Sequence, residues 1–216
     1  KENVTIPYQL TILDNGSEDE TPEIGKALAA KYPEVSYVRV GERGVGVAFR
    51  KGISINTCNL VGYMDIDLST DLKYLGKTIE MFQNDPNLQY VNGSRFSKES
   101  DTKGRKWYRK ITSMGLVLLL KTLFHMKATD AVCGFTFLRK EVAEQLVKES
   151  SQDNGWFYTI EFLLRAERDG MKIYDMPVEW QEDYNTTVKV WKTIKNYLIQ
   201  MYHLKKAFRQ EDKLRK

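Results

Sequence analysis

The chain has 216 residues, which suits one large α/β domain with a sizeable hydrophobic core. A hydrophobic content of 42% and a charged content of 29% are ordinary for a globular protein and exclude disorder of the whole chain. The two cysteines, Cys58 and Cys133, form no CxxC pattern or Cys/His cluster, which excludes a disulfide framework and a structural zinc site and predicts reduced, cytoplasmic thiols.

The formal net charge of +4 is unevenly distributed. From Val188 to Lys216, nine Lys and Arg residues stand against two acidic residues, a net of +7, so the rest of the chain sums to −3. A basic tail behind a slightly acidic body favours an anionic surface as partner, with membrane lipid ahead of nucleic acid. The longest apolar stretch, Ile111 to Met126, contains Lys121 and is too short to span a bilayer.

Short apolar runs alternate with helical patterns early in the chain, which predicts βαβ units and a parallel sheet. We expect strands at residues 8–13, 35–40 and 60–64 and a helix from Thr21 to Tyr32. A tight loop, Arg43 to Gly46, leads into a second helix.

The later elements follow the same two periodicities. They are a helix at 71–84, a strand at 88–92, an apolar helix at 111–124, a strand at 135–138, an amphipathic helix at 157–169, extended chain at 171–180 and a basic helix at 188–208. No linker composition indicates a second domain. We therefore predict one α/β domain over residues 1–187 and a basic amphipathic helix within 188–216.

Two of these helices could lie in a bilayer interface, because basic amphipathic helices with aromatic residues do so. For the helix at 111–124, packing on its own domain is the favoured alternative. For the final helix the two alternatives are equally open.

Charged side chains follow the predicted strands where each strand ends. Asp14 ends the first strand, Arg43 follows the second, and Asp65 and Asp67 follow the third. Ligands bind outside the carboxyl ends of the strands in open parallel sheets. We therefore expect these side chains along one edge, with Arg95 after the next strand pointing to the same place.

Asp65-Ile66-Asp67 is the strongest single motif. Two carboxylates flanking one residue can reach one divalent cation, and Mg²⁺ takes one or two carboxylates together with substrate phosphates. Such a cation would offset the charge on a departing nucleotide diphosphate. The alternative is a solvated acidic turn, but the preceding strand and the following loop favour the metal.

The other candidates are weaker as lone patterns. Arg43-Gly44 could approach a phosphate closely, and Asp14 could accept hydrogen bonds from a base or ribose, although ordinary turns have the same composition. Glu161 could face the cleft or only favour the helix dipole. Cys133 is expected to be a buried small hydrophobic residue.

In chain order, seven patches resemble the inverting family 2 glycosyltransferases of GT-A fold, especially dolichyl-phosphate glucosyl- and mannosyltransferases and their polyprenyl-phosphate relatives. The patches are Leu13-Asp14-Asn15-Gly16-Ser17-x-Asp19-x-Thr21, Arg43-Gly44-x-Gly46-x-Ala48, Asp65-Ile66-Asp67-Leu68-Ser69-Thr70-Asp71, Gly93-Ser94-Arg95, Asp130-x-x-Cys133-Gly134-Phe135, Trp156-x-x-x-x-Glu161 and Pro177-Val178-x-Trp180. Together they are far more specific than any one of them.

The resemblance implies an α/β fold of GT-A type, with a mostly parallel sheet flanked by helices, and a role for each matching residue. Nucleotide-sugar binding would fall to Asp14, Asn15, Arg43, Gly44, Asp65 and Asp67. Mg²⁺ or Mn²⁺ would be held by Asp65, Asp67 and Ser69. Catalysis would involve Asp67, Asp130 and Arg95, and the acceptor or its phosphate would meet Arg95, Glu161 and Lys189.

The implied activity is transfer of a hexose from a nucleotide diphosphate sugar to a polyprenyl or dolichyl phosphate, with inversion, on the cytoplasmic face of a membrane. The Asp-Leu-Ser-Thr-Asp form favours UDP-glucose over GDP-mannose. A lipid phosphate needs little general-base help, whereas a hydroxyl acceptor needs a base, for which Asp130 is the candidate. The alternatives are transfer to a saccharide hydroxyl and a non-catalytic nucleotide-sugar-binding domain; nucleic-acid binding is not expected.

Two departures from the family pattern favour the non-catalytic alternative. The resemblance begins at the family's second strand, so we expect its first strand, with a Pro-x-Tyr-Asn-Glu-like turn, to be absent from this sequence. Thr159 stands where the family usually carries an aspartate, two residues before Glu161.

Overall fold

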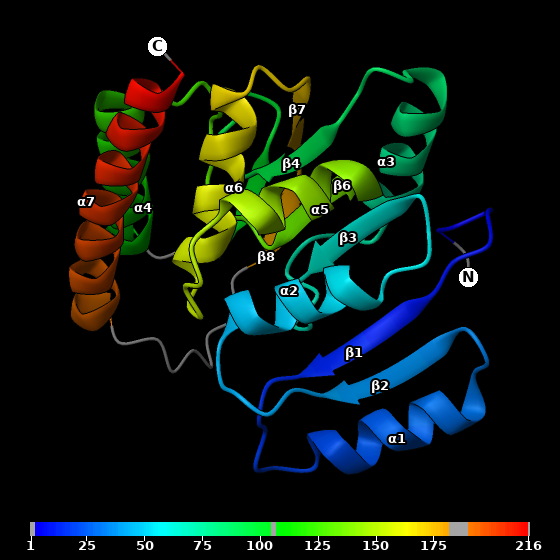
Figure 1. Ribbon diagram of the computed structural model, residues 1–216. Coiled ribbons are helices and arrows are strands. Elements are labelled where there is room, and N and C mark those ends of the chain that lie inside the picture. Colours follow the sequence, from blue (N-terminus) through cyan, green and yellow to red (C-terminus); the bar gives the residue numbers. More distant parts are fainter. Residues whose placement is uncertain (1–2, 105–106, 182–189, 216) are drawn as a thin grey trace.

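The computed structural model describes residues 3–104, 107–181 and 190–215, which form three sheets flanked by helices (Figure 1). This confirms the predicted α/β class. The predicted boundary between residues 187 and 188 lies outside the described residues, and so does Lys189.

The first part of the chain is a βαβα unit. Strands β1 (Leu10–Asp14) and β2 (Val35–Arg39) pair in parallel, and α1 (Thr21–Lys31) connects them. Helix α2 (Val45–Ile55) packs on β1, where a Cβ atom on Gly52 would lie 2.8 Å from a methyl group of Leu13. The predicted βαβ pattern is confirmed here.

The central sheet has four strands in the order β3 (Leu60–Met64), β6 (Phe135–Arg139), β4 (Tyr90–Ser94) and β7 (Ile173–Pro177). Strand β6 is antiparallel to both of its neighbours, while β4 and β7 are parallel. This layer is therefore mixed, while the strand pairs of the other two sheets are parallel.

The reason for the reversal lies in the loop that precedes β6. This loop contains Asp130 and Gly134 and sits against the carboxyl ends of β3 and β4, since Asp65 donates its backbone N–H to Gly134 and Arg95 donates to Asp130. Strand β6 starts at that edge and must run the other way. The reversal delivers Asp130 to the predicted site.

Among the described residues, β1 pairs only with β2, and β3 pairs only with β6. The two sheets are thus separate, and β1 and β3 point the same way in Figure 1. Strands β1 and β3 each have one edge without a partner strand within the described part of the chain.

A third, two-stranded parallel sheet joins β5 (Asp101–Lys103) to β8 (Glu179–Gln181). The other helices are α3 (Lys73–Asn84), α4 (Trp107–Phe124), α5 (Lys140–Glu149), α6 (Phe157–Arg168) and α7 (Val190–Leu214). Helix α5 was not predicted, α4 begins earlier than expected, and α7 continues further. None of the described helices is long and apolar enough to cross a bilayer.

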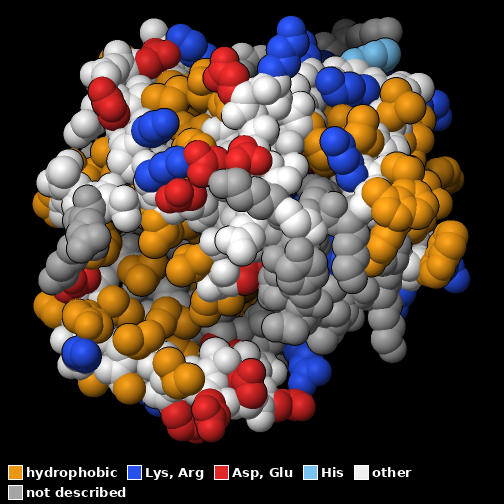
Figure 2. All heavy atoms as spheres, turned by 180° about the vertical axis from the view of Figure 1, so that it is seen from behind, with side chains coloured by type: hydrophobic (Ala, Val, Ile, Leu, Met, Phe, Trp, Pro, Cys, Tyr) orange, Lys and Arg blue, Asp and Glu red, His pale blue; other side chains and the backbone are white. Residues whose placement is uncertain are grey.

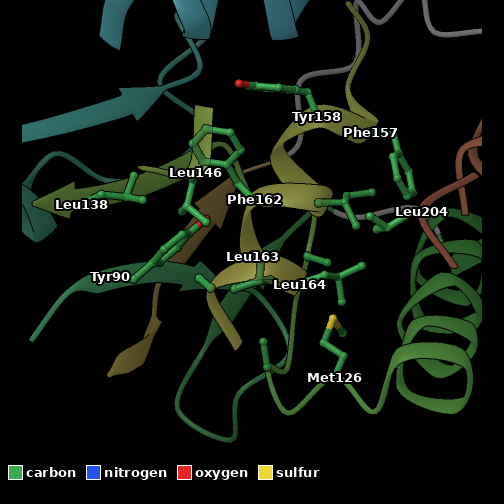
Figure 3. Close-up of a cluster of buried hydrophobic side chains, with 14 of the residues drawn as sticks. Tyr90, Met126, Leu138, Leu146, Phe157, Tyr158, Phe162, Leu163, Leu164 and Leu204 are labelled. Carbon is green, nitrogen blue, oxygen red and sulfur yellow. The ribbon is translucent and has the colours of Figure 1, made fainter. Parts of the chain in front are cut away.

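Helix α6 is the centre of the main hydrophobic core. Nine of the ten residues from Phe157 to Ala166 are buried. The helix is therefore enclosed on most sides, whereas an amphipathic helix with one solvent-facing side was predicted. Figure 3 shows its side chains between the sheet residues Tyr90 and Leu138 on one side and Leu204 of α7 on the other. This core fixes the sheet relative to α4 and α7.

Candidate active site

The predicted metal loop follows β3 and is held closely. Asp65 is half-buried, accepts a hydrogen bond from the Tyr63 hydroxyl, and lies directly over Gly134, where a Cβ atom would come within 1.9 Å of its Oδ2. Gly134 is therefore required by the position of the Asp65 carboxylate. Burial raises the pKa of Asp65, and the nearby charge of Asp67 raises it further, although the hydrogen bond from Tyr63 acts in the opposite direction.

The rest of the loop turns the second carboxylate outward. Asp67 is exposed, and its Oδ1 accepts the backbone N–H of Ser69 at 2.9 Å. Leu68 adopts a positive φ of 53°, a conformation that the hydrogen bond helps to hold. Ser69 is buried, and its carbonyl accepts the N–H of Gln181 from β8 at 2.8 Å.

Arg95 and Asp130 form a buried ion pair beside this loop. The Nε and Nη2 atoms of Arg95 lie 2.7 Å and 3.1 Å from the two carboxylate oxygens of Asp130, and the side chains are 7% and 0% exposed. Burial alone would raise the pKa of Asp130, but Arg95 outweighs it and lowers that pKa. Asp130 in turn raises the pKa of Arg95 against the effect of burial.

The geometry of this pair disfavours Asp130 as the general base that was predicted for a hydroxyl acceptor. A general base must reach the substrate proton, and the Asp130 carboxylate is enclosed with both oxygens committed to Arg95 and to the backbone N–H of Val132. Asp130 instead positions Arg95. The Arg95 guanidinium stacks over Trp180 of β8, 5.3 Å from the ring centroid.

A second group of predicted residues lies after β1 and β2. The buried Asp14 accepts hydrogen bonds from the backbone of Gly16 and Ser17 at 3.1 Å and 2.7 Å and from the Tyr37 hydroxyl at 2.6 Å. Burial raises its pKa, but these donors together hold it at about 2. Asp14 is therefore an anion that shapes the turn in which the half-buried Asn15 lies.

Arg43 and Gly44 occupy the loop before α2. The Arg43 side chain is exposed and pairs with Glu18. Gly44 has φ +142°, and a Cβ atom there would lie 1.9 Å from the carbonyl of Asn154; Gly46 donates its N–H to the same carbonyl at 3.0 Å. These glycines therefore allow the segment 151–155 to close against the loop.

Glu161, for which an acceptor-binding role was predicted, has a buried side chain. It is 1% exposed, and its carboxylate accepts hydrogen bonds from the Ser151 backbone and hydroxyl and from Arg165. Glu161 thus anchors the segment that packs on Gly44. The acceptor role predicted for Lys189 falls outside the described residues.

Sequence reasoning missed several residues that complete the site. Tyr63 and Tyr37 donate to Asp65 and Asp14 from neighbouring strand positions, and Arg50 on α2 donates to the Asp153 carbonyl at 2.7 Å. Tyr63 lies two residues before Asp65, on the same face of β3, which is the one sequence signal that could have indicated it. Cys133 is buried as predicted, and burial raises its pKa to about 12, so its thiol is protonated.

The structure thus brings together Asp65, Asp67, Ser69, Arg95 and Asp130 and places Asp14, Asn15, Arg43 and Gly44 in a separate group. Asp14 is the last residue of β1 and Asp65 directly follows β3, two strands that point the same way in Figure 1. Two surface hollows, of about 270 and 360 Å³, lie elsewhere, at Arg165 and at Leu88, and contain none of these residues.

The oxygen donors of Asp65, Asp67 and Ser69 fit a hard divalent cation that keeps most of its bound water. Within the described ranges there is no group of three or more His, Cys, Asp or Glu side chains arranged for a metal. Two carboxylates and a serine hydroxyl suit Mg²⁺ or Mn²⁺ completed by water and substrate phosphate, and not a structural zinc ion.

Comparison with known sequences decides the family. The profile of glycosyl transferase family 2 matches residues 5–147, about two thirds of the sequence. The chain belongs to glycosyl transferase family 2.

This family 2 chain is similar to three curated relatives. It is 28% identical to glycosyltransferase AglD of Haloferax volcanii (87% of this chain, 30% of the relative), and 29% identical to dolichyl-phosphate beta-glucosyltransferase ALG5A of Trichomonas vaginalis (88% and 59%). It is 28% identical to dolichol-phosphate mannosyltransferase of Pyrococcus furiosus (93% and 56%). The chain therefore spans about a third to three fifths of the length of these relatives.

Solved structures confirm the GT-A-like fold of the family 2 chain. Glucosyl-3-phosphoglycerate synthase from Mycobacterium tuberculosis in complex with UDP superposes with a TM-score of 0.68 at 17% identity, covering 91% of this chain and 68% of that one. The same enzyme with Mn²⁺, UDP and glucosyl-3-phosphoglycerate gives 0.68 at 16% identity, with the same coverage.

Proposed function

We propose that the protein containing this chain transfers a hexose from a nucleotide diphosphate sugar to a polyprenyl or dolichyl phosphate, with inversion at the anomeric carbon. UDP-glucose is the favoured donor and GDP-mannose the next. The observation that carries the proposal is the placement of the Arg95–Asp130 pair beside the Asp65–Ser69 loop. Both groups suit a diphosphate leaving group.

Each residue of the cluster has a distinct part in this proposal. Asp65, Asp67 and Ser69 would hold Mg²⁺ or Mn²⁺, which supplies charge stabilisation of the departing diphosphate. Arg95 remains protonated because Asp130 raises its pKa, and its stacking on Trp180 limits its orientation. A guanidinium fixed before the reaction stabilises developing phosphate charge without reorganisation.

Two observations support a phosphate as the acceptor: the names of two relatives, and the burial of Asp130, the candidate general base. Two of the similar proteins are named for transfer to dolichyl or dolichol phosphate. A phosphate is already anionic and needs no general base, whereas a saccharide hydroxyl needs one. Asp130 is unsuited to that task, which disfavours the hydroxyl alternative. A lipid acceptor also implies that the protein works at a membrane surface, which we propose to be the cytoplasmic face.

A non-catalytic nucleotide-sugar-binding domain is the second candidate. Thr159 supports it, because its hydroxyl donates to the backbone of Trp156 at 3.0 Å and supplies no carboxylate at the position where the family pattern has one. This candidate predicts metal-dependent nucleotide binding without turnover.

The test is release of nucleotide from UDP-glucose and GDP-mannose, with polyprenyl phosphate in detergent and with Mn²⁺, Mg²⁺ or neither. Wild type is compared with Asp67→Ala and with Asp85→Ala, a control carboxylate that pairs with Lys172 away from the site. We expect release that needs lipid and metal, is lost in Asp67→Ala and is kept in Asp85→Ala. Metal-dependent nucleotide binding with no release from either donor would overturn the proposal in favour of the second candidate.

A further inference from the structure

Asp175 on β7 is a half-buried carboxylate that lies outside both groups of candidate site residues. Its Oδ1 accepts a hydrogen bond from Nδ2 of Asn92 at 2.8 Å. Its Oδ2 accepts the backbone N–H of Thr129 at 2.6 Å and the Thr129 hydroxyl at 2.9 Å. The face shown in Figure 2 has many charged side chains at its surface, where water hydrates them. Asp175 instead takes its hydrogen-bond donors from two other segments of the chain.

The buried amide of Asn92 connects Asp175 to the backbone of Asp130. Asn92 lies on β4, opposite Asp175 in the parallel register of β4 and β7. Its Nδ2 atom donates both to the Asp175 carboxylate and, at 2.9 Å, to the carbonyl oxygen of Asp130. An amide nitrogen carries two hydrogens, so both bonds form at once. Asp175 therefore holds the backbone of Asp130 through one buried side chain.

Thr129 connects Asp175 to the turn that contains Arg95. The Oγ1 atom of Thr129 lies 2.6 Å from the Ser94 hydroxyl and 3.0 Å from the Ser97 hydroxyl. Ser94 Oγ in turn accepts the backbone N–H of Ser97 at 3.1 Å. Because Arg95 lies between these two serines, the Thr129 hydroxyl helps to fix the backbone from which the guanidinium extends.

The Asp175 carboxylate sets the direction of the hydrogen bonds in this network. A carboxylate only accepts, so the Thr129 hydroxyl gives its single proton to Asp175. The Thr129 oxygen is then the acceptor for the hydroxyls of Ser94 and Ser97, and the Ser94 oxygen remains an acceptor for the backbone of its own turn. An amide in place of the carboxylate would add a donor and leave these directions undetermined. A buried network specifies one arrangement only while each member is satisfied.

The two members of the buried ion pair thus share one support. Asn92 connects Asp175 to Asp130, and Thr129 connects it to the turn of Arg95. The ion pair by itself fixes only the guanidinium relative to the carboxylate, whereas the place of both in the sheet depends on these contacts between β4 and β7. A group that must meet developing charge has to be held closely, since a misplacement of about 1 Å can cost about a hundredfold in rate.

We propose that Asp175 is a positioning residue for the Arg95 guanidinium, acting through Asn92 and through the hydroxyls of Thr129 and Ser94. Asp175 contacts no substrate in this role and is not a catalytic residue. Its effect on sugar transfer rests on the proposed function, in which Arg95 stabilises the departing diphosphate. Because that charge develops in the transition state, we expect Asp175 to affect kcat more than the KM for the donor.

The first measurement follows the Arg95 guanidinium by NMR of the isotope-labelled chain, without donor, lipid or metal. The Nε–H of Arg95 donates to buried Asp130 at 2.7 Å, so its proton should exchange slowly with water; its resonance is assigned by its loss in Arg95→Lys. We expect Asp175→Asn to speed this exchange by about tenfold, the equivalent of one hydrogen bond. The Nε–H of Arg139, which donates to a backbone carbonyl at 2.8 Å, is the internal control and should keep its rate.

Matched variants distinguish positioning from general stability. Thr129→Ser keeps the hydroxyl and should behave as wild type, whereas Thr129→Val removes it and should speed the Arg95 exchange as Asp175→Asn does. Glu167 of α6 holds the same loop by accepting two backbone N–H groups at 2.8 Å and 2.7 Å. Glu167→Gln should therefore lower the midpoint of thermal unfolding and leave the Arg95 exchange unchanged. Where Asp175→Asn fails to fold, the two Thr129 variants decide the question.

Sugar transfer is the second readout. We expect Asp175→Asn to lower kcat by about tenfold or more with little change in the KM for the donor, and Glu167→Gln to keep the kcat of wild type. Adding Thr129→Val to Asp175→Asn should cause no further loss, because both act by the same route.

Two results would overturn the positioning role. They are an unchanged Arg95 exchange in both Asp175→Asn and Thr129→Val, and an equal acceleration in Glu167→Gln. Because the exchange is measured without donor, a chain that transfers no sugar would contradict the proposed function and still leave the positioning role to be decided by the exchange rates.

Discussion

The side chains of Arg95 and Asp130 are joined by two hydrogen bonds of 2.7 Å and 3.1 Å, although Arg95 follows β4 and Asp130 lies in a loop distant in the sequence. Breaking a buried ion pair leaves one charge without a partner, and removing both charges avoids that cost. Single and double substitutions at this pair therefore distinguish its contribution to stability from its contribution to sugar transfer.

We expect Asp130→Ala to lower the free energy of unfolding by about 3–5 kcal/mol, measured by urea denaturation, because Arg95 stays buried and charged. The Arg95→Met/Asp130→Leu double variant should recover most of that stability and still lack sugar transfer. A double variant that is both stable and active would contradict the role proposed for Arg95.

Gly134→Ala should abolish metal-dependent nucleotide binding, because the added Cβ atom would stand 1.9 Å from Oδ2 of Asp65 and displace the carboxylate. Isothermal titration with UDP and Mn²⁺ measures this loss. Gly115→Ala is the matched control: it meets no atom within 4 Å on α4 and should raise helix stability by about 1 kcal/mol. Equal binding by both variants would show that Asp65 does not contact the metal site.

Tyr63→Phe should weaken metal-dependent nucleotide binding by about tenfold, because residues that orient metal ligands typically contribute that much. Tyr63 donates to Asp65, and removing the hydroxyl leaves that carboxylate without its orienting partner. The control is Tyr174→Phe on β7, an exposed tyrosine away from the site. The effect should appear in the dissociation constant and not in the midpoint of thermal unfolding at neutral pH.

Asp14 should make stability depend on pH in acid. Its pKa of about 2 in the folded state lies below its ordinary value of 3.8, so the unfolded state binds more protons between these values. The stabilisation is complete above about pH 4 and is lost as the pH falls towards 2. The difference in unfolding free energy between wild type and Asp14→Asn should therefore shrink across this range, as urea titrations at several pH values would measure. A difference that stays constant would contradict this role.

The sequence by itself determined the order of most elements and the family. Strands ending in Asp14 and in Asp65-x-Asp67 are visible because strand periodicity and turn residues are local signals. Helix α6 was found at nearly its true bounds, but its almost complete burial was not predicted, since the number of neighbours around a helix is not encoded in its own period.

Only the tertiary structure decided which charged residues share a site. The sequence made Asp130 a candidate base for a hydroxyl acceptor and left the place of Glu161 open. The structure pairs Asp130 with Arg95 and Glu161 with Ser151 and Arg165. Whether a carboxylate is a free base or a buried partner depends on atoms supplied by distant segments. Burial and pairing are properties of packing, whereas residue type and spacing are properties of the chain.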